Sequence, residues 1–72
     1  MEKELIDYMI DHQIENNETD LKLLNIQLEF YSKLLENAKT KEEKKEYQYK
    51  IDNIIQSIDN ELNDLNKLYN LY

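Results

Sequence analysis

The stretch Thr40-Lys41-Glu42-Glu43 divides the chain into two predicted helices. It reads as a capping box, in which the Thr40 hydroxyl accepts a hydrogen bond from the Glu43 N–H group while the Glu43 side chain reaches back over the start of the helix. We therefore predict a turn at about residues 39–40 and a helix over about residues 41–70.

Apolar residues beyond the cap recur with heptad spacing. They follow one another at intervals of 4, 3, 4, 3, 4 and 3 residues: Ile51, Ile55, Ile58, Leu62, Leu65, Tyr69 and Tyr72. Such spacing is typical of a helix with a continuous apolar seam. Tyr47, Ile54 and Leu68 widen this seam on one side, which favours a bundle of more than two helices over a narrow coiled coil.

The segment before the cap carries a similar seam. It comprises Leu21, Leu24, Leu28, Tyr31, Leu35 and Ala38, and the same phase runs back through Ile14 and Ile10, with the polar Asn17 at a core-type position. The weak helix formers of residues 15–20 allow a break near Asn17, with caps at Asn17 or Thr19. Because the apolar phase continues through them, we favour one helix over about residues 2–38.

A second apolar stripe lies beside this seam, formed by Leu23, Ile26, Phe30 and Leu34. One side of the helix can then pack within the chain and the other against a second molecule. The predicted fold is all-α: residues 1–72 form a single helical domain, an antiparallel hairpin that assembles as a coiled-coil-like helical bundle. We assign the second stripe to self-association.

Charge is unevenly distributed along the chain. Sixteen acidic residues and nine lysines, with no arginine, give a net charge of -7. Residues 1–20 hold seven acids and one lysine, whereas residues 21–50 hold seven lysines and five acids. A hairpin would therefore have an acidic open end and a lysine-rich turn end, so two copies attract most when antiparallel. This favours an antiparallel homodimer, a four-helix bundle.

Composition excludes several functional classes. The chain lacks Gly, Pro, Cys and Trp, which excludes glycine-rich phosphate loops, disulfides and cysteine-based zinc sites. Its only histidine, His12, is not part of the Glu-x-x-His pairs that di-metal bundles require. We therefore expect no cofactor, no metal and no enzymatic activity. The acidic charge argues against direct nucleic-acid binding, and the lack of a long apolar run argues against a membrane role and favours a cytoplasmic location.

The most specific feature is a row of carboxylates spaced by 3, 4, 4 and 3 residues: Glu4, Asp7, Asp11, Glu15 and Glu18. On a helix these residues share one face and repel one another, because no lysine lies between residues 4 and 20. The row is either a recognition surface for a basic partner or simply a solvated face of an acidic protein. Two tyrosines near the acidic end, Tyr8 and Tyr72, are candidate anchors for such a partner.

These patterns predict a non-catalytic protein-interaction module. The expected function is that of a small acidic inhibitor or regulator, of the kind that phages and mobile elements direct against host defence or nucleic-acid enzymes, which binds and blocks a basic surface while resembling a row of phosphates. The alternative is a structural scaffold, chaperone or assembly protein that acts through its apolar helical face. Ionic strength would distinguish the two functions, because binding through the acidic row weakens steeply as salt rises, whereas binding through the apolar face does not.

Overall fold

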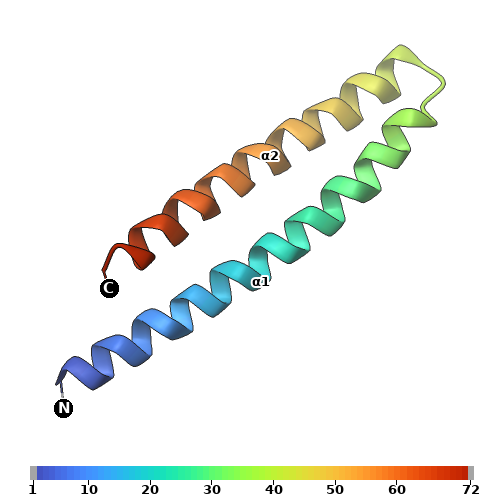
Figure 1. The fold of residues 1–72 in the computed structure, drawn as a ribbon. Coiled ribbons are helices and arrows are strands. Elements are labelled where there is room, and N and C mark those ends of the chain that lie inside the picture. The colour runs from blue at the N-terminus through green and yellow to red at the C-terminus, as the bar shows by residue number, and fades with distance from the viewer. Residues whose placement is uncertain (1, 72) are drawn as a thin grey trace.

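The computed structural model describes residues 2–71, which form two antiparallel helices joined by a short turn (Figure 1). Helix α1 spans Glu2–Glu36 and helix α2 spans Lys41–Tyr69. The molecule is a rod with extents of 59 × 15 × 11 Å. The predicted all-α hairpin is confirmed, with α1 ending at Glu36 rather than at about residue 38.

Helix α1 is continuous through the segment that allowed a break. Thr19 donates its hydroxyl proton to the backbone carbonyl of Glu15 at 3.0 Å, and the side chain of Gln13 donates to Oδ1 of Asn17 at 2.9 Å. Both potential capping side chains therefore make bonds within one helix instead of starting a new one. Asn17 is 4% exposed and lies in the seam between the helices.

The turn has the predicted cap, with one difference. Thr40 has an extended backbone, and its hydroxyl accepts a hydrogen bond from the N–H of Glu43 at 3.1 Å. The Glu43 carboxylate accepts a bond from the N–H of Lys39 at 3.3 Å, one residue before the capping threonine. The reciprocal arm of the capping box thus holds the turn itself as well as the start of α2.

The inward face of α2 differs from the predicted seam. Three residues assigned to the seam, Ile55, Leu62 and Tyr69, are 45%, 47% and 49% exposed. The covered line is instead Tyr47, Ile51, Ile54, Ile58, Glu61, Leu65 and Leu68. A single partner helix covers only one side of so wide an apolar surface, and here the covered side includes a glutamate.

Two contacts show the register of the helices. Near the turn, Nζ of Lys50 lies 5.2 Å from the ring centroid of Tyr31. Toward the open end, the Tyr69 hydroxyl donates to Oε1 of Glu18 at 2.9 Å. Because α1 is the longer helix, its first turns project beyond the end of α2 (Figure 1). Leu5 and Ile6, two apolar residues of these turns, are accordingly 59% and 55% exposed.

Candidate interaction surfaces

The two predicted surfaces lie on different flanks of α1. Glu18 and Leu23 are five residues apart, which separates their side chains by about 140° around a helix. Glu18 contacts Tyr69 on one flank of the hairpin. On the other flank, Ile26 and Phe30 share a hollow with Lys50 of α2. The acidic face and the apolar face are therefore separate surfaces of the hairpin.

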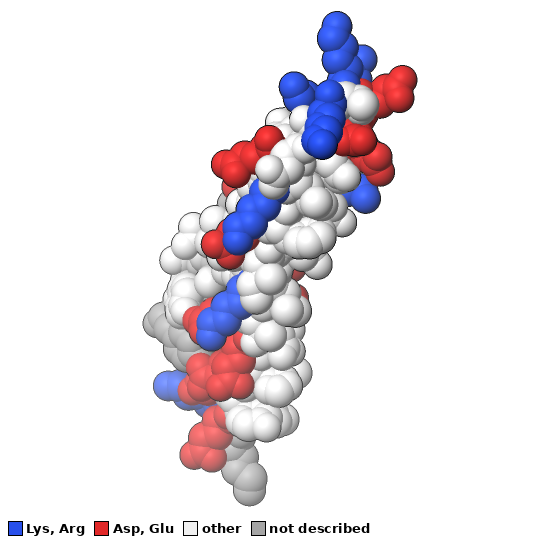
Figure 2. Space-filling view, turned by 90° about the vertical axis from the view of Figure 1, so that its right-hand side faces the viewer, with Lys and Arg blue, Asp and Glu red and all other residues white. Residues whose placement is uncertain are grey.

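The acidic stripe, which we define as Glu4, Asp7, Asp11, Glu15 and Glu18, runs along α1 toward the open end. Four of these side chains are exposed and Asp7 is half-buried. Figure 2 shows lysines concentrated at the turn end, with carboxylates among them, and mostly carboxylates toward the opposite end of the rod. The nearest lysine of α2, Lys67, lines a hollow with Gln13 on the other flank. Within α1, no lysine interrupts the stripe.

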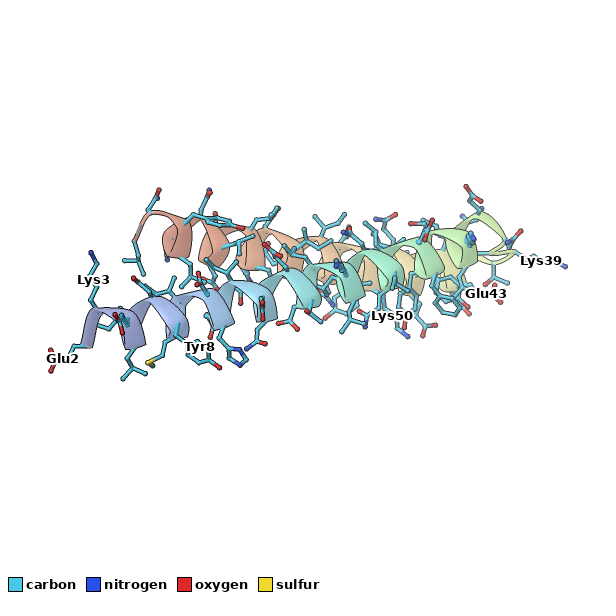
Figure 3. All side chains as sticks on the ribbon, turned by 60° about the horizontal axis from the view of Figure 1, so that its bottom comes forward. Glu2, Lys3, Tyr8, Lys39, Glu43 and Lys50 are labelled. Atoms are coloured by element: carbon cyan, nitrogen blue, oxygen red, sulfur yellow. The ribbon has the colours of Figure 1, made fainter. Side chains whose placement is uncertain are left out.

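Tyr8 lies among the carboxylates of the stripe, four residues after Glu4 and three before Asp11. Its side chain is 68% exposed and stacks on the His12 ring, with 6.2 Å between centroids and 6° between planes. It lies on a part of α1 away from α2 (Figure 3). The aromatic pair offers apolar area next to negative charge. The other predicted anchor, Tyr72, lies outside the described residues.

Glu18 has a second role within the hairpin. The hydrogen bond from the Tyr69 hydroxyl to its carboxylate raises the pKa of that phenol above its usual value, and some desolvation and the negative charge of Glu18 act in the same direction. Glu18 is therefore a stripe residue that also ties α1 to α2.

The apolar flank carries the predicted self-association residues. Leu23, Ile26 and Phe30 are 54%, 62% and 58% exposed, whereas Leu34 is half-buried. Single exposed apolar residues are common on protein surfaces, but three within eight positions on one flank make a patch.

A hollow of about 540 Å³ opens beside this patch, between the two helices. Its apolar lining comes from Ile26, Phe30, Tyr31 and Ile54, and its polar edge from Gln27, Lys50 and Asn53. The Phe30 ring meets Tyr31 edge to face at 5.4 Å, and the Lys50 ammonium lies near the same Tyr31 ring. The lysine is thus held at the edge of the hollow by a cation–π contact.

A second apolar hollow, of about 350 Å³, was missed in the sequence. It lies at the open end and is lined by Ile6, Met9, Ile10, Gln13, Leu68 and Leu71. Ile6, Met9 and Leu71 are 55%, 61% and 65% exposed. A signal was present, because Met9 precedes Phe30 by 21 residues, or three heptads, and so continues the second apolar stripe.

Within residues 2–71, no group of three or more His, Asp or Glu side chains is arranged to hold a metal ion. Neither α1 nor α2 has an apolar stretch long enough to cross a membrane. No protein-family description, curated protein or solved structure matches this chain.

Proposed function

We propose that this chain is a non-catalytic binding protein whose acidic stripe docks on a basic surface of another protein and blocks it. The observation that carries the proposal is the exposure of Glu4, Asp11 and Glu15 along one flank of α1, beside the exposed ring of Tyr8. The two kinds of group together suit a basic protein surface that also has apolar area.

Electrostatics favours such a partner. Like charges three or four residues apart on a helix destabilise it by a few tenths of a kcal/mol for each pair. Lysine or arginine side chains of a partner would relieve that repulsion on binding. The long-range field of the acidic end would also accelerate the encounter.

The proposed mechanism is occupancy. Carboxylates at intervals of roughly 5–6 Å along a helix offer a row of negative charge to a site that ordinarily binds phosphates. Tyr8 then adds apolar contact, which slows dissociation. A host nucleic-acid-binding protein is the partner class that this surface fits best, and inhibition by a small protein of a phage or other mobile element is the corresponding biological role.

Affinity capture from the native host lysate tests this proposal. The bait is compared with a stripe variant, Glu4→Lys, Asp11→Lys, Glu15→Lys, which reverses three exposed charges. A matched control, Glu29→Lys, Glu36→Lys, Asp52→Lys, makes the same change of net charge at exposed positions toward the turn. Circular dichroism first establishes that all three proteins are helical.

The proposal predicts one basic protein that wild type and control capture and the stripe variant does not. It is overturned if the stripe variant captures the same proteins as wild type. It is equally overturned if the control loses them too, because net charge rather than the stripe would then be responsible.

The hollow beside Ile26 and Phe30 favours a second candidate function, that of a scaffold or assembly protein acting through its apolar flank. Binding of that kind changes little with ionic strength, whereas binding by the stripe weakens steeply. Capture repeated at low and high salt separates the two functions.

A further inference from the structure

The turn-end hollow beside Phe30 and the open-end hollow beside Met9 are related by a shift of 21 residues along the sequence. Three residues of the open-end hollow lie 21 positions from a residue of the turn-end hollow. The pairs are Met9 and Phe30, Ile10 and Tyr31, and Leu71 and Lys50, with the open-end residue first. Three heptads return a packed helix to the same face. The hollows therefore lie on one flank of the rod, separated by about 31 Å along α1.

Their midpoint coincides with the middle of the rod. Met9 and Phe30 are placed symmetrically about Thr19 and Asp20, and Thr19 is the central residue of α1. A two-fold axis through this point, perpendicular to the rod, exchanges the two ends. It would place the open-end hollow of one copy against the turn-end hollow of the other.

The exposed surface area is large enough for such covering. A compact monomer of 8.8 kDa exposes about 4,800 Å² by the usual scaling of surface with mass. The hairpin exposes 6077 Å². The excess is larger than the roughly 800 Å² that each partner buries in a standard protein interface.

Charge favours the antiparallel orientation. Residues 1–20 carry seven acids and one lysine at the open end, whereas residues 21–50 carry seven lysines and five acids, with Lys39, Lys41, Lys44 and Lys45 around the turn. In an antiparallel pair the acidic end of each copy lies beside the lysines of the other. In a parallel pair the two acidic ends would repel each other.

We propose that a second copy of this chain docks antiparallel on the apolar flank, so that Met9 of each copy packs against Phe30 of the other and the two hairpins form a four-helix bundle. The interface is isologous, since both copies use the same surface. The acidic stripes lie on the opposite flank of each hairpin and stay accessible. The dimer thus carries two acidic faces, and its existence does not depend on what those faces bind.

Cross-linking tests the arrangement directly, because the chain has no cysteine of its own. Met9→Cys and Phe30→Cys proteins are prepared separately and treated with a short bismaleimide, alone and as a mixture. The proposal predicts a cross-linked dimer in the mixture, while each protein alone gives no more than the urea-denatured baseline. Tyr49→Cys, at a position 68% exposed and outside both hollows, serves as a further baseline.

Two results would overturn the proposal. One is a mixture that cross-links no better than the denatured baseline. The other is Phe30→Cys alone cross-linking as fast as the mixture, which would place the two turn ends together.

Light scattering gives a second readout. Wild type is expected at twice the chain mass of 8.8 kDa, and both Met9→Glu and Phe30→Glu at half the wild-type value, although these positions lie at different ends of the rod. Tyr49→Glu is expected to stay dimeric. A wild-type mass equal to one chain, or equal loss of mass in all three variants, contradicts the proposal.

Discussion

The Tyr69 hydroxyl donates a hydrogen bond of 2.9 Å to Oε1 of Glu18, across the two helices and 51 positions apart in the chain. Tyr69 is about half exposed, so the bond lies at the edge of the hairpin rather than in its core. This contact joins the acidic stripe to α2 and gives the register of the open end. We expect it also to make the stability of the hairpin sensitive to high pH.

The pKa of Tyr69 is raised above its ordinary value of 10.0 by the hydrogen bond to Glu18. The folded state then holds the phenolic proton more tightly than the unfolded state. The stabilisation by the Tyr69–Glu18 hydrogen bond is therefore fully present below pH 10, and it is lost as the pH rises through the pKa of Tyr69 in the folded state. Tyr69→Phe should remove this part of the pH dependence. In Glu18→Gln the pKa of Tyr69 should fall, as followed by the carbon NMR shift of its ring. An unchanged titration in that variant would mean that Glu18 does not cause the shift.

Asn17 is the most buried polar residue within residues 2–71, at 4% exposure, and lies in a seam that is otherwise mostly apolar. A polar residue at such a position specifies register at some cost in stability. Asn17→Leu should therefore raise the free energy of unfolding by about 1 kcal/mol. Urea titration at a fixed protein concentration measures the change. A loss of stability would show instead that the bond from Gln13 to Asn17 is net stabilising.

The capping role of Thr40 gives a paired prediction. Thr40→Ala removes the acceptor for the Glu43 N–H and should destabilise the hairpin by about 1 kcal/mol. Thr19→Ala, which removes a hydroxyl bonded within α1, should be neutral or slightly stabilising, because alanine is the better helix former. Thermal unfolding followed by circular dichroism compares the two variants. Equal effects would contradict the assignment of Thr40 as the cap.

Glu61 places a carboxylate in the seam of α2. Its Oε2 atom is shielded from solvent and has no hydrogen-bond partner, and an unsatisfied polar atom of this kind costs about 1–3 kcal/mol. Glu61→Leu should therefore stabilise the hairpin, by about 1 kcal/mol or more. Asp59→Leu, at an exposed position of the same helix, should change stability by less than about 0.5 kcal/mol. Urea unfolding measures the free energy of unfolding of both variants. Destabilisation by Glu61→Leu would be inconsistent with a shielded, unpaired carboxylate oxygen at this position.

The fold was largely predictable because its signals are local. The cap at Thr40 depends on four consecutive residues, and the continuity of α1 on an unbroken apolar phase through Asn17. The inward face of α2 was not predictable in the same way. Ile54 and Ile55 are equally apolar, and only packing against α1 decides which is covered. The predicted line was right at Ile51, Ile58 and Leu65 and wrong at Ile55, Leu62 and Tyr69, which are exposed.

The candidate surfaces were predictable in part. Heptad spacing was sufficient to group the carboxylates, and their exposure agrees with it except at the half-buried Asp7. The hollow around Met9 and Leu71 could be recognised only in the structure, because its lining comes from both ends of the chain. The same holds for Lys50, whose place over the Tyr31 ring depends on the register of the hairpin.

Binding through the acidic stripe is tested most directly by the affinity between this protein and its captured partner, measured by calorimetry at low and high salt for wild type and the stripe variant. Wild-type binding should weaken steeply as salt rises, and the stripe variant should not bind even at low salt. Affinity that is independent of salt, and the same in both proteins, would contradict the central claim that the acidic stripe is the binding site.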